Sequence, residues 1–132
     1  KQVCAGIKKH QDIKTGLWYQ VMDQEGREGN YLEATGSSMF VYALLKAERL
    51  GYIDKEYKIV GERGYNGLIA KLVKDNKDGT ISLTNCCAVA GLGGTPYRDG
   101  SYEYYIKEPI RENDPKGVGP FIMAALEYNK KR

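Results

Sequence analysis

The sequence is short of the residues that most often bind transition metals. It has one histidine, His10, and three cysteines, Cys4, Cys86 and Cys87, among its 132 residues. A structural zinc site needs about four Cys or His ligands at close spacing, and His10 has no cysteine or second histidine at such a spacing. An odd set of cysteines with two adjacent members is also a poor disulfide framework. The sequence therefore predicts no metal and no cofactor, and Cys86 and Cys87 are expected to be small buried residues.

Long apolar runs and runs of like charge are also missing. No apolar run approaches the roughly 20 residues that span a bilayer, so no membrane partner is expected. The 20 basic and 17 acidic residues give a formal net charge of +3 and are interleaved along the chain, which argues against nucleic acid as a partner. The chain starts at Lys1 without an initiating Met or a signal-type apolar stretch, and we therefore expect further sequence upstream of it.

Helical periodicity and clustered glycines dominate what is present. Apolar residues recur at helical spacing over 39–50, over 57–72 after a potential cap at Asp54, and over 118–126. The buried face of the second segment is expected to carry Tyr57, Val60, Gly61, Gly64, Leu68, Ile69 and Leu72. Segment 86–105 has no period, and long loops of this kind are usually functional. We predict one all-α domain of helical hairpins whose functional loops collect at one end.

Groups suited to saccharide recognition lie near the first two of these segments. Sugar binding needs flat apolar surfaces for ring faces together with amides and charged groups for hydroxyls and acids. Trp18 and Gln20 supply both kinds, although the only tryptophan can equally anchor the core. Glu33 precedes the helix over 39–50, where it is either a ligand or a structural cap that gains from the helix N-terminus.

Two later segments add charged groups. Arg98 and Asp99 stand in a loop dense in hydrogen-bonding groups, where they either face a ligand or form a salt bridge that holds the loop shut. Asn113 and Lys116 run directly into the last helix, whose N-terminal amides can accept an anion. A uronate carboxylate would fit there with Lys116 as its countercharge, and an Asn/Asp-Pro turn of no chemical interest is the alternative.

Four stretches carry a resemblance to a known family. They are QDIKTGLWYQVMD at 11–23, GREGNYLEATGSSMFVYALLKAERLGY at 26–52, AVAGLGGTPYRDGSYEYY at 88–105 and ENDPKGVGPFIMAALE at 112–127. In this order they resemble the unsaturated rhamnogalacturonyl hydrolases of glycoside hydrolase family 105, relatives of the family 88 unsaturated glucuronyl hydrolases. The resemblance implies the C-terminal third of an (α/α)6 toroid, with residues 1–132 as a single partial domain of the six-hairpin glycosidase type.

The resemblance also implies the chemistry. These enzymes add water across the C4=C5 bond of the unsaturated uronic acid that lyases leave on pectin oligosaccharides, and an aspartic acid protonates that bond. Neither that aspartate nor the family's Trp-x-Arg-Gly-Asn-Gly-Trp stretch matches a position in this chain, so no residue here is expected to be catalytic and the chain is expected to be inactive alone. The expected substrate-binding residues are Trp18, Gln20, Glu33, Arg98, Asp99, Asn113 and Lys116.

Two other functions remain open on the sequence alone. One is an ordinary glycosidase with two carboxylates, for example Glu33 and Asp99 at the separation that such mechanisms require. The other is a non-enzymatic helical module that binds carbohydrate or oligomerises through Trp18 and the tyrosines. Helix faces made for absent neighbours also predict self-association. The compartment stays open between the cytoplasm and the periplasm of a bacterium.

Overall fold

The computed structural model describes residues 1–130, which form five helices and four short strands. The helices are α1 (Gln2–Lys9), α2 (Ala34–Arg49), α3 (Glu56–Lys71), α4 (Tyr102–Lys107) and α5 (Pro115–Tyr128), and the strands are β1 (Val73–Asp75), β2 (Ile81–Leu83), β3 (Cys86–Cys87) and β4 (Ile110–Arg111). The mostly helical fold predicted from the sequence is confirmed. No helix within residues 1–130 combines the length and apolarity needed to cross a membrane.

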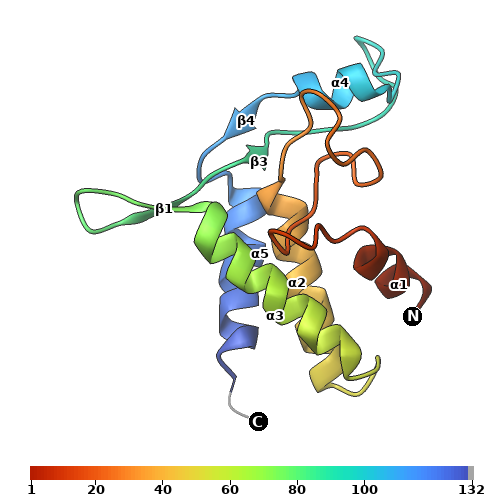
Figure 1. Ribbon diagram of the computed structural model, residues 1–132. Helices are drawn as coiled ribbons and strands as arrows, with labels where there is room; N and C mark the ends of the chain where they lie inside the picture. Colours follow the sequence, from red (N-terminus) through yellow and green to blue (C-terminus); the bar gives the residue numbers. More distant parts are fainter. Residues whose placement is uncertain (131–132) are drawn as a thin grey trace.

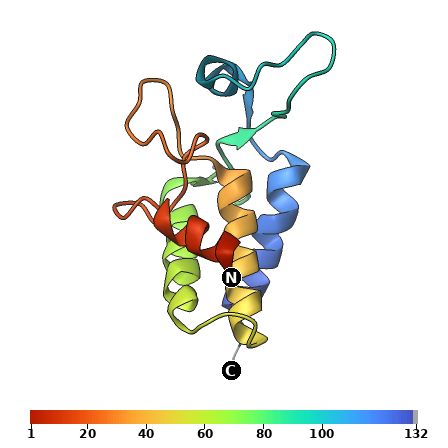
Figure 2. The ribbon, with the colours of Figure 1, turned by 90° about the vertical axis from the view of Figure 1, so that its right-hand side faces the viewer.

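The centre of the molecule is a bundle of α2, α3 and α5. α2 packs against both other helices, and all three run side by side in two perpendicular views (Figures 1 and 2). Gly61 and Gly64 make the close approach of α3 to α2 possible, because a Cβ at Gly61 would lie 2.8 Å from Leu45 Cδ2 and one at Gly64 would lie 2.7 Å from Val41 Cγ2. The two glycines weaken α3 as an isolated helix, and this packing explains their presence.

Different local interactions determine where α2 and α3 begin. α2 begins at Ala34, earlier than the apolar periodicity indicated, because the Glu33 side chain caps it, and Gly51 with φ +76° follows its last turn. The prediction that Asp54 caps α3 is wrong. Lys55 is the N-cap residue and makes no side-chain cap bond, while Asp54 contributes only its carbonyl oxygen, which accepts from the Tyr57 amide.

Five large apolar residues expected on buried helix faces are exposed. Met39 and Leu50, at the two ends of segment 39–50, are 45% and 44% exposed, Ile69 on α3 is 44% exposed, and Ile122 and Leu126 on α5 are 53% and 63% exposed. Each keeps the helical spacing of its buried neighbours. Periodicity therefore located the helices correctly and overestimated the width of their buried stripes.

The strands form two small antiparallel pairs. β1 and β2 make a hairpin that projects from the bundle (Figure 1). β3 pairs with β4 and ties the two ends of segment 88–109 together. Within that segment α4 was not anticipated; the Ser101 hydroxyl caps it by accepting from the Tyr104 amide.

Candidate functional site

Both long loops lie at one end of the helix bundle. Segments 10–33 and 84–114 gather over the end at which α2 and α5 begin and α3 finishes (Figures 1 and 2). The expectation that the loops collect at one end is confirmed. Every residue that the sequence nominated for substrate binding lies in these loops or in the first turn of a helix that leaves them.

Glu33 is a buried structural cap. Its carboxylate accepts hydrogen bonds from the amides of Thr35 and Gly36 in the first turn of α2, at 2.9 and 2.5 Å. It also accepts from the Cys87 amide of β3 at 2.9 Å. Both carboxylate oxygens are therefore occupied by backbone donors, and Glu33 joins the start of α2 to the β3–β4 pair. This is the structural alternative that the sequence left open.

Trp18 lies in the core rather than in an open wall. Its side chain is 1% exposed, and its indole N–H donates to the carbonyl of Ile7 at 2.7 Å. The ring packs edge-on against Phe40, with centroids 5.4 Å apart. Because the polar atom of the indole is already satisfied, Trp18 contributes an apolar surface and a link between α1 and α2.

Gln20 belongs to a half-buried cluster around the Cys87 thiol, a contact that the sequence did not indicate. Gln20 Nε2 lies 3.3 Å from Cys87 Sγ, and the same thiol interacts with the Tyr31 hydroxyl. Burial raises the pKa of the Cys87 thiol and the pKa of the Tyr31 phenol above their ordinary values. Both groups therefore stay neutral near pH 7, and Cys87 behaves as the small buried residue that we expected.

A small cavity opens beside the first turns of α2. It measures about 140 Å³ and is lined by Trp18, Tyr19, Gln20, Met22, Glu33, Gly36, Ser37 and Phe40. The structure thus brings together three of the seven nominated residues. The cavity has an aromatic side and an amide side, the combination that saccharide rings require.

Arg98 and Asp99 form a separate group and do not pair with each other among residues 1–130. Arg98 Nε donates to the Gly93 carbonyl at 2.8 Å, and Gly91 leaves space for its guanidinium, since a Cβ there would lie 2.8 Å from Arg98 Nη1. Asp99 is exposed, and its carboxylate accepts from the Ser101 amide, which holds the pKa of Asp99 below its ordinary value. Each residue braces its own loop.

The N-terminus of α5 is occupied by a carboxylate of the chain itself. Asp114 is the N-cap and accepts from the Lys116 amide at 3.0 Å and from Lys116 Nζ at 2.6 Å. These bonds from Lys116 hold the pKa of Asp114 below its ordinary value. The side chain of Asn113 accepts from the Leu83 amide at 2.9 Å. The anion that meets Lys116 is therefore Asp114, and the signal that could have shown this is Asp followed by Pro at a helix start.

A contact between the two loops was also missed. The Arg27 guanidinium lies 3.7 Å from the Tyr102 ring centroid and 2.9 Å from Glu103 Oε1. The Tyr102 hydroxyl donates to the carbonyl of Glu28 at 2.9 Å. These bonds fasten the loop before α2 to α4. Nothing local in the sequence marks them, because the partners are about 75 residues apart.

The carboxylates of the described residues do not form a metal site. No group of three or more His, Cys, Asp or Glu side chains within residues 1–130 is arranged to hold an ion. Glu33 and Asp99, the pair considered for a two-carboxylate mechanism, differ sharply in setting. Glu33 is buried and bonded to three amides, whereas Asp99 is exposed at a loop.

Comparison with known proteins gives the family. The sequence model of Glycosyl Hydrolase Family 88 matches residues 1–132. A solved structure of a family 105 glycoside hydrolase from C. acetobutylicum ATCC 824 is 53% identical with a TM-score of 0.91, covering 95% of this chain and 35% of that one. A crystal structure from Salmonella enterica serovar Paratyphi A, described as a possible member of the GH105 family, is 26% identical with a TM-score of 0.76, covering 95% and 29%.

A curated relative agrees with these structures. The 24.9 kDa protein in picA locus of Rhizobium radiobacter is 44% identical over 133 residues, which cover 96% of this chain and 57% of that protein. The chain thus spans little more than half of this relative and about a third of the two solved structures. Its helices correspond to part of the six-hairpin glycosidase fold. The chain belongs to glycosyl hydrolase family 88.

Proposed function

We propose that this chain is the C-terminal third of a glycoside hydrolase domain that acts on the 4,5-unsaturated uronic acid end of rhamnogalacturonan or pectin oligosaccharides. In the proposed reaction water adds across the C4=C5 bond, a proton going to one carbon and hydroxide to the other, and the resulting hemiketal rearranges to release the next sugar. The acid that protonates the bond is supplied from outside residues 1–132, so the chain alone is inactive.

The observation that carries this proposal is that the two long loops lie at the same end of the helix bundle. The two long loops cover the N-terminal ends of α2 and α5, in a chain whose family is that of glycosyl hydrolases. Binding groups usually reside on loops that a rigid frame positions. Among residues 1–130, the carboxylates of Glu33 and Asp114 both cap helices. Neither is therefore available as an acid for the reaction.

We propose that the nominated residues build the rim of the substrate pocket. Gln20 provides one wall beside the small cavity at α2, Trp18 supports that wall from the core, and Glu33 fixes it to β3. Arg98 and Asp99 hold the opposite loop in shape, and Asn113 with Lys116 fixes the start of α5.

An assay with an unsaturated rhamnogalacturonan disaccharide tests this function. We expect no loss of the double-bond absorbance with the chain alone, and robust turnover would contradict an inactive fragment. Titration of the disaccharide, followed through amide chemical shifts, is expected to move the signals of Gln20 and its neighbours. If the saturated disaccharide produces the same shifts at the same concentration, the assignment to the unsaturated end is wrong.

The exposed face of α5 favours a second property, self-association. Ile122, Met123 and Leu126 are exposed on one helix, Leu126 to 63%, and contiguous apolar patches of this kind usually find a partner. We propose that the chain associates through this face. Sedimentation velocity is expected to show species heavier than a monomer, and their loss in a Leu126→Glu variant. A compact monomer at all concentrations would contradict the proposal.

A further inference from the structure

A trough follows the outer side of α3, between that helix and the first residues of segment 10–33. Segment 8–16 runs beside the helix: the Gln11 amide donates to the Val60 carbonyl at 2.9 Å, and Thr15 lies against Gly67. Two adjoining hollows of about 420 and 440 Å³ lie along this line, and they share Ile13, Ile59 and Arg63 as lining residues. The sixteen residues of α3 give the trough a length of about 22 Å at a rise of about 1.5 Å per residue.

The wall of the trough is rigid. Asp12 is buried, and its carboxylate accepts from the Thr15 amide at 2.9 Å. Thr15 and Gly16 then touch α3 so closely that a Cβ at Gly67 would lie 2.2 Å from the Thr15 carbonyl oxygen. A ligand would therefore meet a preformed surface and would not have to order a loop, which lowers the cost of binding.

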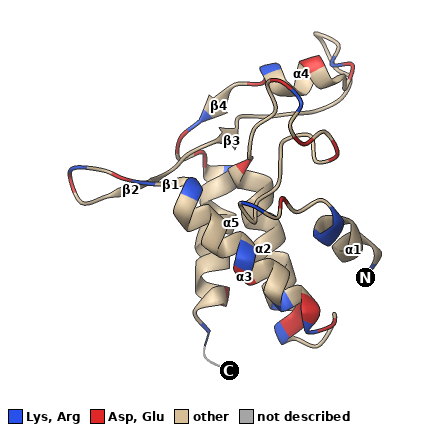
Figure 3. Ribbon diagram, viewed as in Figure 1, with Lys and Arg blue, Asp and Glu red and all other residues tan. Residues whose placement is uncertain are grey.

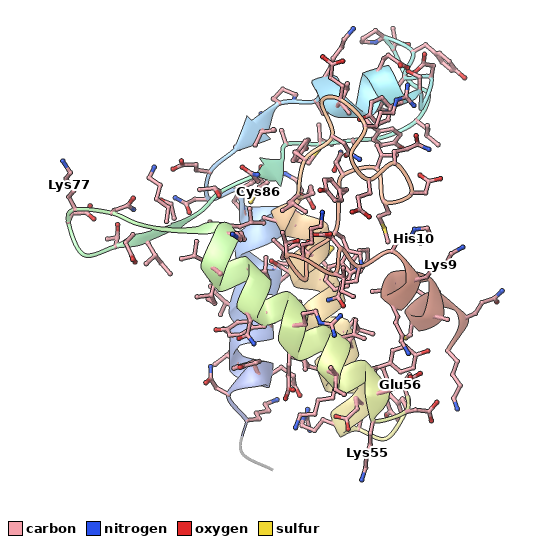
Figure 4. The ribbon with its side chains drawn as sticks, viewed as in Figure 1. Lys9, His10, Lys55, Glu56, Lys77 and Cys86 are labelled. Carbon is pink, nitrogen blue, oxygen red and sulfur yellow. The ribbon has the colours of Figure 1, made fainter. Side chains whose placement is uncertain are left out.

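Cations line the trough along its whole length. Lys9 stands at one end, Arg63 in the middle, and Lys14 with Lys71 at the other end; none of these four forms a salt bridge with another residue of 1–130. Two carboxylates also line the trough, and each forms an exposed ion pair, Glu56 with Lys8 at 2.5 Å and Glu62 with Lys58 at 3.3 Å. Basic residues still outnumber acidic ones among the lining residues. Figure 3 shows the blue segments of α1 and α3 on this side of the molecule, and Figure 4 shows Lys9 near the end of α1.

Between the cations the floor is aliphatic. Ile13 is 78% exposed and Ile59 is 60% exposed. C–H groups of sugar rings can pack on both side chains. A row of cations with aliphatic floor between them matches a polymer that repeats a carboxylate on every sugar ring.

We infer that this trough is an accessory site that binds a uronate chain remote from the substrate's unsaturated end. The inference rests on the proposed function, because that function makes an acidic oligosaccharide the substrate. Carboxylates of successive sugars would pair with Lys14, Arg63 and Lys71, and ring faces would lie over Ile13 and Ile59. Such a site holds the polysaccharide near the enzyme without taking part in the reaction.

A saturated hexamer of galacturonic acid is the probe, because it has no double bond for the reaction to use. Its affinity for the chain is measured by isothermal titration at low and high salt. The test variant combines Lys14→Gln, Arg63→Gln and Lys71→Gln. The control combines Lys77→Gln, Lys107→Gln and Lys130→Gln, which removes the same charge away from the trough; Figure 4 shows Lys77 at the tip of the β1–β2 hairpin and Lys55 beside Glu56 at the start of α3.

The trough variant is expected to bind the hexamer at least about tenfold more weakly, and the control variant within about twofold of the wild type. Salt is expected to weaken wild-type binding. Equal losses in the two variants would mean that net charge alone attracts the hexamer, and would overturn the site. Equal binding of neutral maltohexaose would overturn it as well, and so would a poly-glutamate peptide that binds the trough more tightly than the hexamer.

Two controls distinguish loss of the trough site from loss of folding and from failure of the proposed function. Circular dichroism of both triple variants checks that they are folded. If a triple variant is unfolded, the single variant Arg63→Gln is used instead, and hexamer binding is followed through the amide chemical shifts of α3. Because the hexamer carries no unsaturated end, its binding at the trough does not depend on whether the unsaturated disaccharide binds at the loop end. Failure of the trough and failure of the proposed function are therefore distinguishable.

Discussion

Replacement of Glu33 by glutamine is expected to destabilise the whole loop end of the molecule. The glutamine amide has nearly the shape of the carboxylate, so the change removes charge and one acceptor while leaving the volume unchanged. Its oxygen can still accept from Thr35 and Cys87, but its NH2 group then faces the Gly36 amide, where the carboxylate oxygen lay 2.5 Å away. The variant thus loses one bond to a charged acceptor and places two donors together.

The size of the effect follows from these bonds. A hydrogen bond to a charged group contributes about 1.5 to 3 kcal/mol, and an unsatisfied buried donor costs a similar amount. The lost hydrogen bond and the unsatisfied donor concern the same Gly36 amide, so the two costs are not added in full. We expect the free energy of unfolding to fall by about 2 to 3 kcal/mol. For a domain of this size that corresponds to a fall in Tm of about 10 °C. Glu28→Gln in the same loop is the control, because the Glu28 side chain is exposed and such changes usually stay within about 0.5 kcal/mol.

Urea denaturation followed by circular dichroism measures the free energy of unfolding of both variants, and thermal denaturation measures their Tm. Hydrogen exchange adds a local readout, since the Cys87 amide is expected to exchange faster in Glu33→Gln while amides in the middle of α3 follow only the global change. A Tm within about 2 °C of the wild type would refute the reasoning. It would mean that Glu33 is not the link between α2 and β3 that its three bonds indicate.

Two further predictions concern the helices. Gly64→Ala is expected to destabilise the chain by about 1 to 3 kcal/mol because its Cβ would overlap Val41. Gly6→Ala, with open space around the Cβ, is expected to stabilise α1 by about 0.5 to 1 kcal/mol, and equal Tm shifts of the two variants would contradict this. Burial alone would raise the pKa of Glu127, but hydrogen bonds from Arg49 and Lys130 lower it below its ordinary value. These bonds therefore stabilise the fold above the unfolded-state pKa of about 4.3 and lose their effect as pH falls through the lower folded-state value, so wild-type stability should fall in acid more steeply than that of Glu127→Gln.

The fold was predictable where the signal is local. Helical periodicity located α2, α3 and α5. The exposed Ile69 and Leu126 show the limit of the method, since a period gives the axis of a helix but not the width of the face that is covered. α4 was missed because its six residues are too few to display a period.

The candidate site was less predictable because its bonds join distant parts of the chain. Glu33 meets the Cys87 amide 54 residues away, and Gln20 meets the Cys87 thiol 67 residues away. No spacing rule connects such positions. The one local signal, Asp114 before Pro115, indicates a helix cap and not a ligand site. It supports the Asn/Asp-Pro turn, the alternative to a uronate that faces Lys116.

The partners of the loop-end cations bear on where a uronate would be gripped. Lys116 binds Asp114, Arg27 binds Glu103, and Arg98 donates to the Gly93 carbonyl. The N-termini of α2 and α5, the other positive features at this end, are capped by Glu33 and Asp114. A substrate carboxylate at this end would have to displace one of these internal partners, at the cost of leaving it unpaired. In the proposed function the catalytic acid therefore comes from outside this chain, and its own loops contact the unsaturated sugar through the surface around Gln20 rather than through Lys116, Arg27 or Arg98.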